Sequence, residues 1–182
     1  MKTITLHNKI FEVFIPETEI AAIVHSVSNS INNSEIKDPL FIAVMNGAFL
    51  FASDVMRKIT IPNTEISFIK LSSYGANMQS SGTVRLIKDI SADITDRDVI
   101  IVEDIIDTGL TIKFLKSRFE EAGTKSITFV TCLYKADNII NLNFKVDYIG
   151  FKIPDKFVVG YGLDYNQKYR GLPSIYVINE EN

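Results

Sequence analysis

The sequence predicts an α/β protein with a mostly parallel central sheet flanked by helices. Two observations carry this prediction. Short apolar runs alternate along the chain with segments whose apolar residues recur at helical spacing. One of these runs, Val99–Val102, is wholly apolar, which is typical of a parallel strand buried on both faces. Strands that alternate with helices indicate βαβ units, and such units build parallel sheets.

The first half of the chain contains the first of these units. A helix is expected after Pro16, with one apolar face formed by Ile20, Ile23, Val24, Val27 and Ile31. A strand is expected at Leu40–Met45, where an apolar run ends at Asn46-Gly47. The helix behind it would have as its apolar residues Ala48, Ala52, Val55 and Ile59. Glu65–Leu71 has the composition of the next strand.

The second half repeats the pattern. The strand Val99–Val102 leads to Gly109, and a helix would follow with the apolar residues Ile112, Leu115, Phe119 and Ala122. Gly123 is a favourable end for that helix. Two more strands are expected at Ile127–Leu133 and Val146–Phe151. Residues 72–83 are polar and nearly aperiodic, and so long a loop is either a functional lid or disordered.

Length and composition favour one domain spanning residues 1–182, with 46% hydrophobic and 23% charged residues. A net charge of −3 offers no basic excess, so neither nucleic acid nor a membrane surface is expected as a partner. The single cysteine, Cys132, lies in an apolar run and should be a buried thiol in a reducing compartment. Because no signal-like or membrane-length apolar stretch is visible, a cytoplasmic location is expected.

The segment Val99–Thr111 carries most of the chemical information. A buried strand leads into the adjacent acids Glu103 and Asp104, and then through Asp107 into a turn of small residues that opens a helix. Open α/β sheets bind their ligands at the carboxyl ends of the strands. The backbone N–H groups and hydroxyls of Thr108–Thr111, at a helix N-terminus, suit a phosphate.

The three carboxylates beside this turn would repel a phosphate, so they must face another group. Sugar hydroxyls, a metal ion or a proton on a base would each suit them, and a phosphorylated ribose would bring phosphate, sugar and metal together. The alternative is structural: Glu103 and Asp104 would cap the following turn, and Asp107 would cap the helix.

Val99–Thr111 resembles the phosphoribosyl pyrophosphate signature of the type I phosphoribosyltransferases, in which four apolar residues, two acids and two apolar residues precede Asp-Thr-Gly-X-Thr. Three further segments resemble one member family, the hypoxanthine-guanine phosphoribosyltransferases: Val44–Gly47, Leu71–Tyr74, and Phe151–Tyr165 followed by Arg170. The resemblance runs from about residue 40 to about residue 175. It implies the type I fold, with a small hood formed by about residues 150–182 and by N-terminal residues.

The resemblance implies purine salvage, in which phosphoribosyl pyrophosphate and hypoxanthine or guanine give IMP or GMP and pyrophosphate. It also implies Mg²⁺ as cofactor and a homodimer or homotetramer. Asp107 would be the catalytic acid or base at purine N7. The phosphoribosyl group would be bound by Glu103, Asp104, Asp107, Thr108, Gly109, Leu110 and Thr111. Pyrophosphate would be bound by Asn46, Gly47, Ser73, Tyr74 and Arg170. The purine would be bound by Lys135, Phe157, Val158 and Asp164, and the metal by Glu103, Asp104 and Asp164.

Two residues depart from the family pattern, because Leu110 and Asn46 stand where some relatives carry lysine. Phosphate affinity should therefore depend more on backbone donors. The family often has a cis peptide bond at the position of Met45–Asn46. Ser73–Ser81 would be the mobile lid that excludes water from the reaction.

Each implied role has a simpler alternative. Lys135 could be a solvated lysine at a strand end, Phe157 a core phenylalanine, Asp164 a turn residue and Arg170 a surface charge. For the whole chain, the competing function is a superfamily regulator that binds nucleotide and nucleic acid without catalysis, which the acidic balance disfavours. An orotate or adenine phosphoribosyltransferase would share Glu103–Thr111 but not the purine-side segments.

Overall fold

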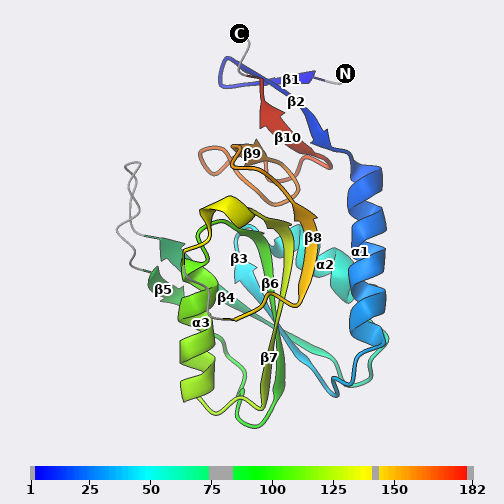
Figure 1. Ribbon diagram of the computed structural model, residues 1–182, viewed down its shortest axis with the longest axis vertical. Helices are drawn as coiled ribbons and strands as arrows, with labels where there is room; N and C mark the ends of the chain where they lie inside the picture. Colours follow the sequence, from blue (N-terminus) through cyan, green and yellow to red (C-terminus); the bar gives the residue numbers. More distant parts are fainter. Residues whose placement is uncertain (1–2, 74–83, 141–143, 180–182) are drawn as a thin grey trace.

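Six strands form the larger sheet of the computed structural model, which describes residues 3–73, 84–140 and 144–179 (Figure 1). From one edge to the other they are β5 (Val84–Lys88), β4 (Glu65–Ser73), β3 (Leu40–Met45), β6 (Asp98–Ile106), β7 (Ser126–Tyr134) and β8 (Tyr148–Lys152). Only β5 runs antiparallel to its neighbour, and the other strands pair in parallel. The predicted fold class is therefore confirmed.

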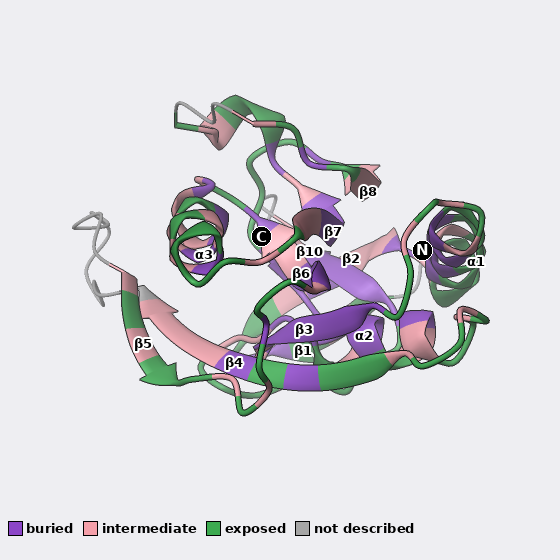
Figure 2. Ribbon diagram, turned by 90° about the horizontal axis from the view of Figure 1, so that it is seen from below, coloured by how far each residue is buried: buried purple, intermediate pink, exposed green. Residues whose placement is uncertain are grey.

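Three α-helices cover this sheet: α1 (Glu17–Asn32), α2 (Phe49–Met56) and α3 (Leu110–Glu121). The first two lie on one face and α3 lies on the other (Figure 2). Alternate residues of β3 therefore enter different cores: Phe41 packs in the core of α1 and α2, and Ile42 packs in the core of α3. Burial on both faces explains why this strand reads as an unbroken apolar run. No helix in the described ranges is long and apolar enough to cross a membrane.

A second, antiparallel sheet forms the hood over the carboxyl ends of the core strands (Figure 1). Its strands, in order, are β1 (Thr3–Leu6), β2 (Lys9–Ile15), β10 (Ile175–Ile178) and β9 (Val158–Val159). The two ends of the chain thus meet in one sheet. The β1–β2 hairpin was not predicted from the sequence. The sequence signal for this hairpin is the pair His7-Asn8, because both residues have positive φ, as a two-residue type I′ turn requires.

The strand β6 is longer than predicted, and this changes where the acids lie. It pairs with β3 only as far as Val102, but it continues beside β7 as far as Ile106. Glu103 and Asp104 are therefore strand residues, whereas the sequence analysis placed them after the strand. The apolar pattern stops at Val102 because the next two positions of β6 are acids, although the strand itself continues.

Three smaller differences concern β8, α2 and the predicted lid. The strand β8 begins at Tyr148, since the Asp147 side chain accepts the Phe129 N–H at 2.8 Å and interrupts regular strand pairing there. The helix α2 ends at Met56, before Ile59. Of the predicted lid, Ser73 is the last residue of β4, and residues 74–81 lie outside the described residues. Cys132 is a buried free thiol, as predicted.

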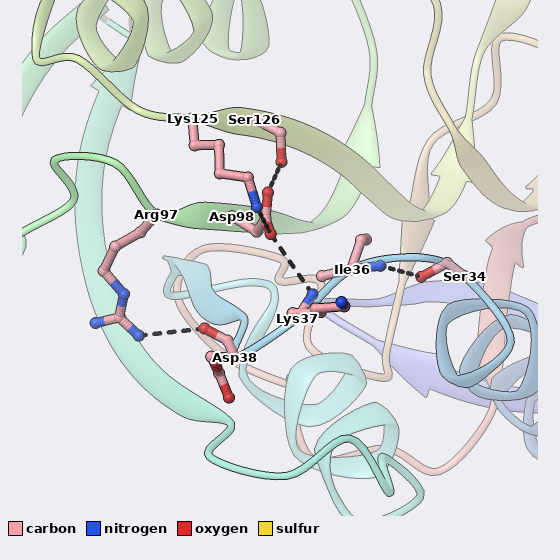
Figure 3. A network of polar contacts seen from close by, with 8 residues as sticks. All are labelled: Ser34, Ile36, Lys37, Asp38, Arg97, Asp98, Lys125 and Ser126. Atoms are coloured by element: carbon pink, nitrogen blue, oxygen red, sulfur yellow. Dashed lines mark hydrogen bonds and ion pairs between the residues drawn. The ribbon is translucent and has the colours of Figure 1, made fainter.

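A polar network closes the amino-terminal edge of the main sheet (Figure 3). Asp98, the first residue of β6, accepts hydrogen bonds from the side chains of Lys125 and Ser126 and from the Lys37 N–H. Partial burial acts to raise the pKa of Asp98, but these bonds hold it below its ordinary value. This edge thereby ties the starts of β6 and β7 to the loop before β3.

The hood is attached to the core through Tyr161. Its backbone lies in the left-handed region, with φ of 48°, and its side chain is buried. The hydroxyl donates to Oδ2 of Asp54 in α2 at 2.7 Å, and the N–H donates to the Leu172 carbonyl at 2.8 Å. Burial, followed by the bond to Asp54, raises the pKa of Tyr161, so the hydroxyl stays a donor at neutral pH.

We expect Tyr161→Phe to lower the free energy of unfolding by about 1 kcal/mol, the net value of one such hydrogen bond. Asp54 is partly exposed, so water can replace the lost partner and limit the loss. Urea denaturation measures it. Tyr148→Phe is the matched control, because the Tyr148 hydroxyl has no hydrogen-bond partner among the described residues and its loss should change stability little. Equal effects of the two substitutions would contradict the role of the Tyr161–Asp54 bond.

Candidate active site

The carboxyl ends of four neighbouring parallel strands meet beneath the hood (Figure 1). Polar residues from the sequence motifs, or with a role that the resemblance implies, lie at or after each of these strand ends. Asn46 and Gly47 follow β3, Glu103–Asp107 end β6, Lys135 follows β7, and Asp155 lies three residues beyond β8. Because parallel strands end at the same edge of a sheet, segments far apart in the chain come together here.

The two acids Glu103 and Asp104 lie within β6, before its carboxyl end. Glu103 is buried, and burial followed by the neighbouring charge of Asp104 raises its pKa well above the usual range. Burial also raises the pKa of Asp104 to about 6, although the Ile105 N–H and the charge of Arg170 oppose this. A pair of acids that resists ionisation marks a place where positive charge would be stabilised.

Asp107 stands above them, after the end of β6, and its side chain is half exposed. Its Oδ1 accepts from Asn138 Nδ2 at 2.7 Å, and its Oδ2 lies 3.3 Å from Lys135 Nζ. It does not cap the following helix, because α3 has no side-chain cap. The structural alternative for Asp107 is therefore wrong.

Lys135 is buried, with only 7% of its surface exposed. Its ammonium group lies 3.3 Å from Asp107 Oδ2 and 2.8 Å from Asp155 Oδ1. A buried lysine needs such partners, because removing an unpaired charge from water is costly. Lys135 is therefore no solvated strand-end lysine.

The turn from Thr108 to Thr111 leads into α3. Gly109 has a φ of 82° and precedes the first helical residue, Leu110. The Leu110 N–H has only a long contact of 3.5 Å with the Thr108 hydroxyl. Because no side chain caps α3, the N–H groups of its first turn, which follows the end of β6, can bind an anion.

Gly47 packs closely against both Asp104 and Gly162. One residue earlier, the Met45–Asn46 peptide bond is cis, as the resemblance implied. A Cβ atom on Gly47 would lie 1.6 Å from Asp104 Oδ2, and one on Gly162 would lie 2.0 Å from the Gly47 carbonyl oxygen. The two glycines thus let the loop after β3 pack between Asp104 and the hood.

We expect Gly162→Ala to destabilise the protein by about 1–3 kcal/mol, the usual range for overpacking. The new methyl group would meet backbone that cannot rotate away, at a φ of 99° that side-chain residues rarely adopt. Gly171→Ala is the matched control, since no atom lies within 4 Å of its Cβ position, and it should stay within about 0.5 kcal/mol. Both are measured by urea denaturation, and an undisturbed Gly162→Ala protein would contradict the close contact.

Asp164 and Arg170 form an ion pair at 2.7 Å on the hood side. Arg170 also donates to the Gly162 carbonyl at 2.7 Å, and Asp164 accepts the Gln167 N–H at 2.8 Å. Asp164 therefore acts as a turn residue as well, and Arg170 is no free surface charge. The charge of Arg170 acts to lower the pKa of Asp104, and the charge of Asp164 acts to raise it.

Phe157 is 49% exposed, so it is no core phenylalanine. Its ring lies beside Phe11 and Tyr165, with centroids 6.4 and 5.4 Å away. The next residue, Val158, is buried and pairs with Val177 in the hood sheet. The hood thus presents an open aromatic face next to a fixed backbone segment, which suits a flat ring.

The site does not contain a complete metal cage. Among the described residues no group of three or more His, Cys, Asp or Glu side chains could hold an ion by itself. Mg²⁺, however, is usually held by one or two carboxylates together with water and substrate phosphates. The neighbouring acids Glu103 and Asp104 fit this mode, because burial raises both pKa values and a bound cation would favour their ionised forms.

Two residues of the site were missed as functional candidates. Asn138 lies in the short 3-10 helix Ala136–Asn138 after β7, and Asp155 lies inside a motif that was matched without assigning it a role. A polar residue just beyond a strand end was the available signal for both. Of the predicted residues, the side chain of Ser73 is not described and Tyr74 lies outside the described residues.

Comparisons with known proteins agree with this geometry. Residues 16–166 match the family model of the phosphoribosyl transferase domain. The hypoxanthine-guanine phosphoribosyltransferase of Bacillus subtilis is 42% identical over 175 residues, which cover 95% of this chain and 96% of the relative. The hypoxanthine phosphoribosyltransferase of Escherichia coli is 39% identical over 167 residues, which cover 90% and 93%. A crystal structure of the Bacillus anthracis hypoxanthine-guanine phosphoribosyltransferase superposes with a TM-score of 0.85 at 40% identity, covering 92% of this chain and 98% of that one. The chain therefore belongs to the hypoxanthine-guanine phosphoribosyltransferase family.

Proposed function

We propose that this protein transfers the phosphoribosyl group of phosphoribosyl pyrophosphate to hypoxanthine, guanine or both, giving IMP or GMP and pyrophosphate. Family membership supports the reaction class. The observation that carries the proposal is the contact between Asp107 and the buried Lys135, at the carboxyl ends of β6 and β7. It provides a proton acceptor and a fixed cation side by side, which a 6-oxopurine needs at N7 and at its 6-oxygen.

The purine would stack on the exposed ring of Phe157, with its edge at the Val158 backbone. Lys135 would donate to the 6-oxygen. Asp107 would take the proton from N7 as N9 forms its bond to ribose C1 and the bond from C1 to the pyrophosphate oxygen breaks. The Lys135 cation draws electron density toward the 6-oxygen and thereby eases the loss of that proton.

The phosphoribosyl group would lie on the turn and on the acids of β6. The backbone N–H groups from Asp107 to Thr111, those of Gly109 and Leu110 among them, would hold the 5′-phosphate at the start of α3, which no side chain caps. Glu103 and Asp104 would face the ribose hydroxyls. As the C1–O bond stretches, the sugar becomes positively charged, and these carboxylates stabilise that charge.

The pyrophosphate would lie between the loop after β3 and the hood, against Asn46, Gly47, Ser73, Tyr74 and Arg170. Mg²⁺ held by Glu103 and Asp104, together with water and substrate phosphates, would offset the negative charge of the leaving group. Asp164, which the resemblance also implied as a ligand, pairs with Arg170 and forms no three-carboxylate group with the two acids among the described residues. Arg170 already donates to the Gly162 carbonyl, so its guanidinium group is held in a set orientation. The proposed working unit is a homodimer or homotetramer of a single 182-residue domain in the cytoplasm.

The direct test is a purine panel with phosphoribosyl pyrophosphate and Mg²⁺. Release of pyrophosphate and formation of nucleotide are followed for hypoxanthine, guanine, xanthine and adenine. We expect turnover with hypoxanthine or guanine and almost none with adenine. Turnover with no purine, or with adenine alone, would overturn the proposal.

A further inference from the structure

Four side chains form a polar group at the ends of β6, β7 and β8. Lys135 Nζ lies 2.8 Å from Asp155 Oδ1 and 3.3 Å from Asp107 Oδ2. Asn138 Nδ2 donates to Asp107 Oδ1 at 2.7 Å. Asp155 joins this group through Lys135, and the Lys135 hydrogen bond, followed by the influence of the Asn138 side chain, holds the pKa of Asp155 below its ordinary value.

The backbone holds the members of this group in place. The Lys135 N–H donates to the Ile106 carbonyl at 3.0 Å, and the Asn138 N–H donates to the Lys135 carbonyl at 3.2 Å. On the other side, the Ile153 N–H donates to the Tyr134 carbonyl at 3.0 Å. Pro154, whose ring fixes φ, then precedes Asp155. The loops after β7 and β8 are therefore fixed relative to each other, and so is the spacing of Lys135 and Asp155.

The two carboxylates compete for one ammonium group, and Asp155 is the closer of the two. An ammonium group has three N–H donors, so two bonds within this group leave one for a ligand. Without Asp155, the buried Lys135 would keep one anionic partner among the described residues, Asp107. The ammonium would then pair more tightly with Asp107, and it would occupy the carboxylate that has to take the purine proton.

We propose that Asp155 is a positioning residue that competes with Asp107 for the Lys135 ammonium group, keeps their contact loose at 3.3 Å, and aims Lys135 at the 6-oxygen of the base. The inference rests on the proposed function, but Asp155 need not touch the substrate. One carboxylate thus supports both the choice of a 6-oxopurine and the freedom of Asp107 to accept a proton.

The test compares Asp155→Ala, Asp155→Asn and Asp155→Glu with the matched control Asp137→Ala. Asp137 lies two residues after Lys135, is exposed, and makes no hydrogen bond or ion pair with the described residues. Its removal changes the net charge by the same amount. The Asp155 side chain is 64% exposed, so its replacement should not prevent folding, which the unfolding midpoint verifies. For each protein kcat and KM are measured with hypoxanthine and with adenine.

We expect Asp155→Ala to lower kcat/KM for hypoxanthine by about 10- to 100-fold, typical for the loss of a hydrogen bond between charged groups, while adenine changes less. The hypoxanthine-to-adenine ratio should therefore fall. Asp155→Asn keeps an acceptor without the charge, so its hypoxanthine-to-adenine ratio of kcat/KM should lie between those of the wild type and Asp155→Ala. Asp155→Glu should restore part of this ratio, and Asp137→Ala should keep the wild-type ratio. An unchanged ratio, or an equal loss with both bases, would overturn the role of Asp155. An inactive wild-type protein would instead overturn the proposed function.

Discussion

Replacing Asp107 by asparagine is expected to lower kcat by about 10²–10⁴-fold, the usual contribution of general acid–base assistance. Asparagine has almost the same shape, but it cannot take up the N7 proton. Its amide group would also turn a donor toward Lys135 or Asn138, which are themselves donors to Asp107. Single-turnover and steady-state rates with hypoxanthine measure the loss.

The fold should survive this change, because the Asp107 side chain is half exposed and caps no helix. The unfolding midpoint of Asp107→Asn should therefore stay near that of the wild type. Asp137→Asn is the matched control on the neighbouring loop and should keep full activity. A wild-type kcat in Asp107→Asn would remove Asp107 from the mechanism.

The choice between 6-oxopurines and adenine should depend on Lys135, with a larger effect than the one expected for Asp107 on kcat. An ammonium group can serve the 6-oxygen of hypoxanthine or guanine, but it meets another donor in the 6-amino group of adenine. Sites built around such a hydrogen bond reject the mismatched analogue by about 10⁴–10⁵-fold. Lys135→Ala should lose much of the 6-oxopurine rate and narrow the gap to adenine. The measurement is kcat/KM for both bases in both proteins.

A second variant separates charge from packing at this position. Lys135 is buried, so its alkyl chain fills space as well as carrying charge, and Lys135→Met keeps most of that volume. Both variants should narrow the gap to adenine if the ammonium group selects the base. If the ratio of kcat/KM for hypoxanthine to kcat/KM for adenine is the same in the wild type and in both variants, Lys135 does not select the base.

The sequence was most informative about the core strands. Leu40–Met45 was predicted with the bounds that β3 has, because burial on both faces leaves an unbroken apolar run. The same rule misplaced the end of β6, because the strand continues beside β7 through two acids, Glu103 and Asp104, at which the apolar run stops. The hairpin of β1 and β2 was missed although His7-Asn8 is a local turn signal, and the pairing of β2 with β10 joins segments far apart in the chain.

The phosphate turn and the purine-side residues were predictable, since they lie in short contiguous motifs whose chemistry is local. The positive φ of Gly109 and the open N–H groups of α3 follow from the order Asp-Thr-Gly-Leu-Thr. The partners of these residues were not predictable. Asn138 and Asp155 are ordinary polar residues in sequence, and their contacts with Asp107 and Lys135 exist only when three strands end at one edge.

The amino-acid sequence by itself determined the α/β class, the phosphate-binding turn and the reaction family, because periodic burial and local backbone chemistry are written in neighbouring residues. The tertiary structure alone decided how the charges are distributed in the site. It brought Asp155 closer to Lys135 than Asp107 is, and it pressed Gly162 against the loop of Gly47 beside Asp104. The physical reason is that hydrogen bonds and close packing act over a few ångströms, and parallel strands bring distant parts of the chain within that range.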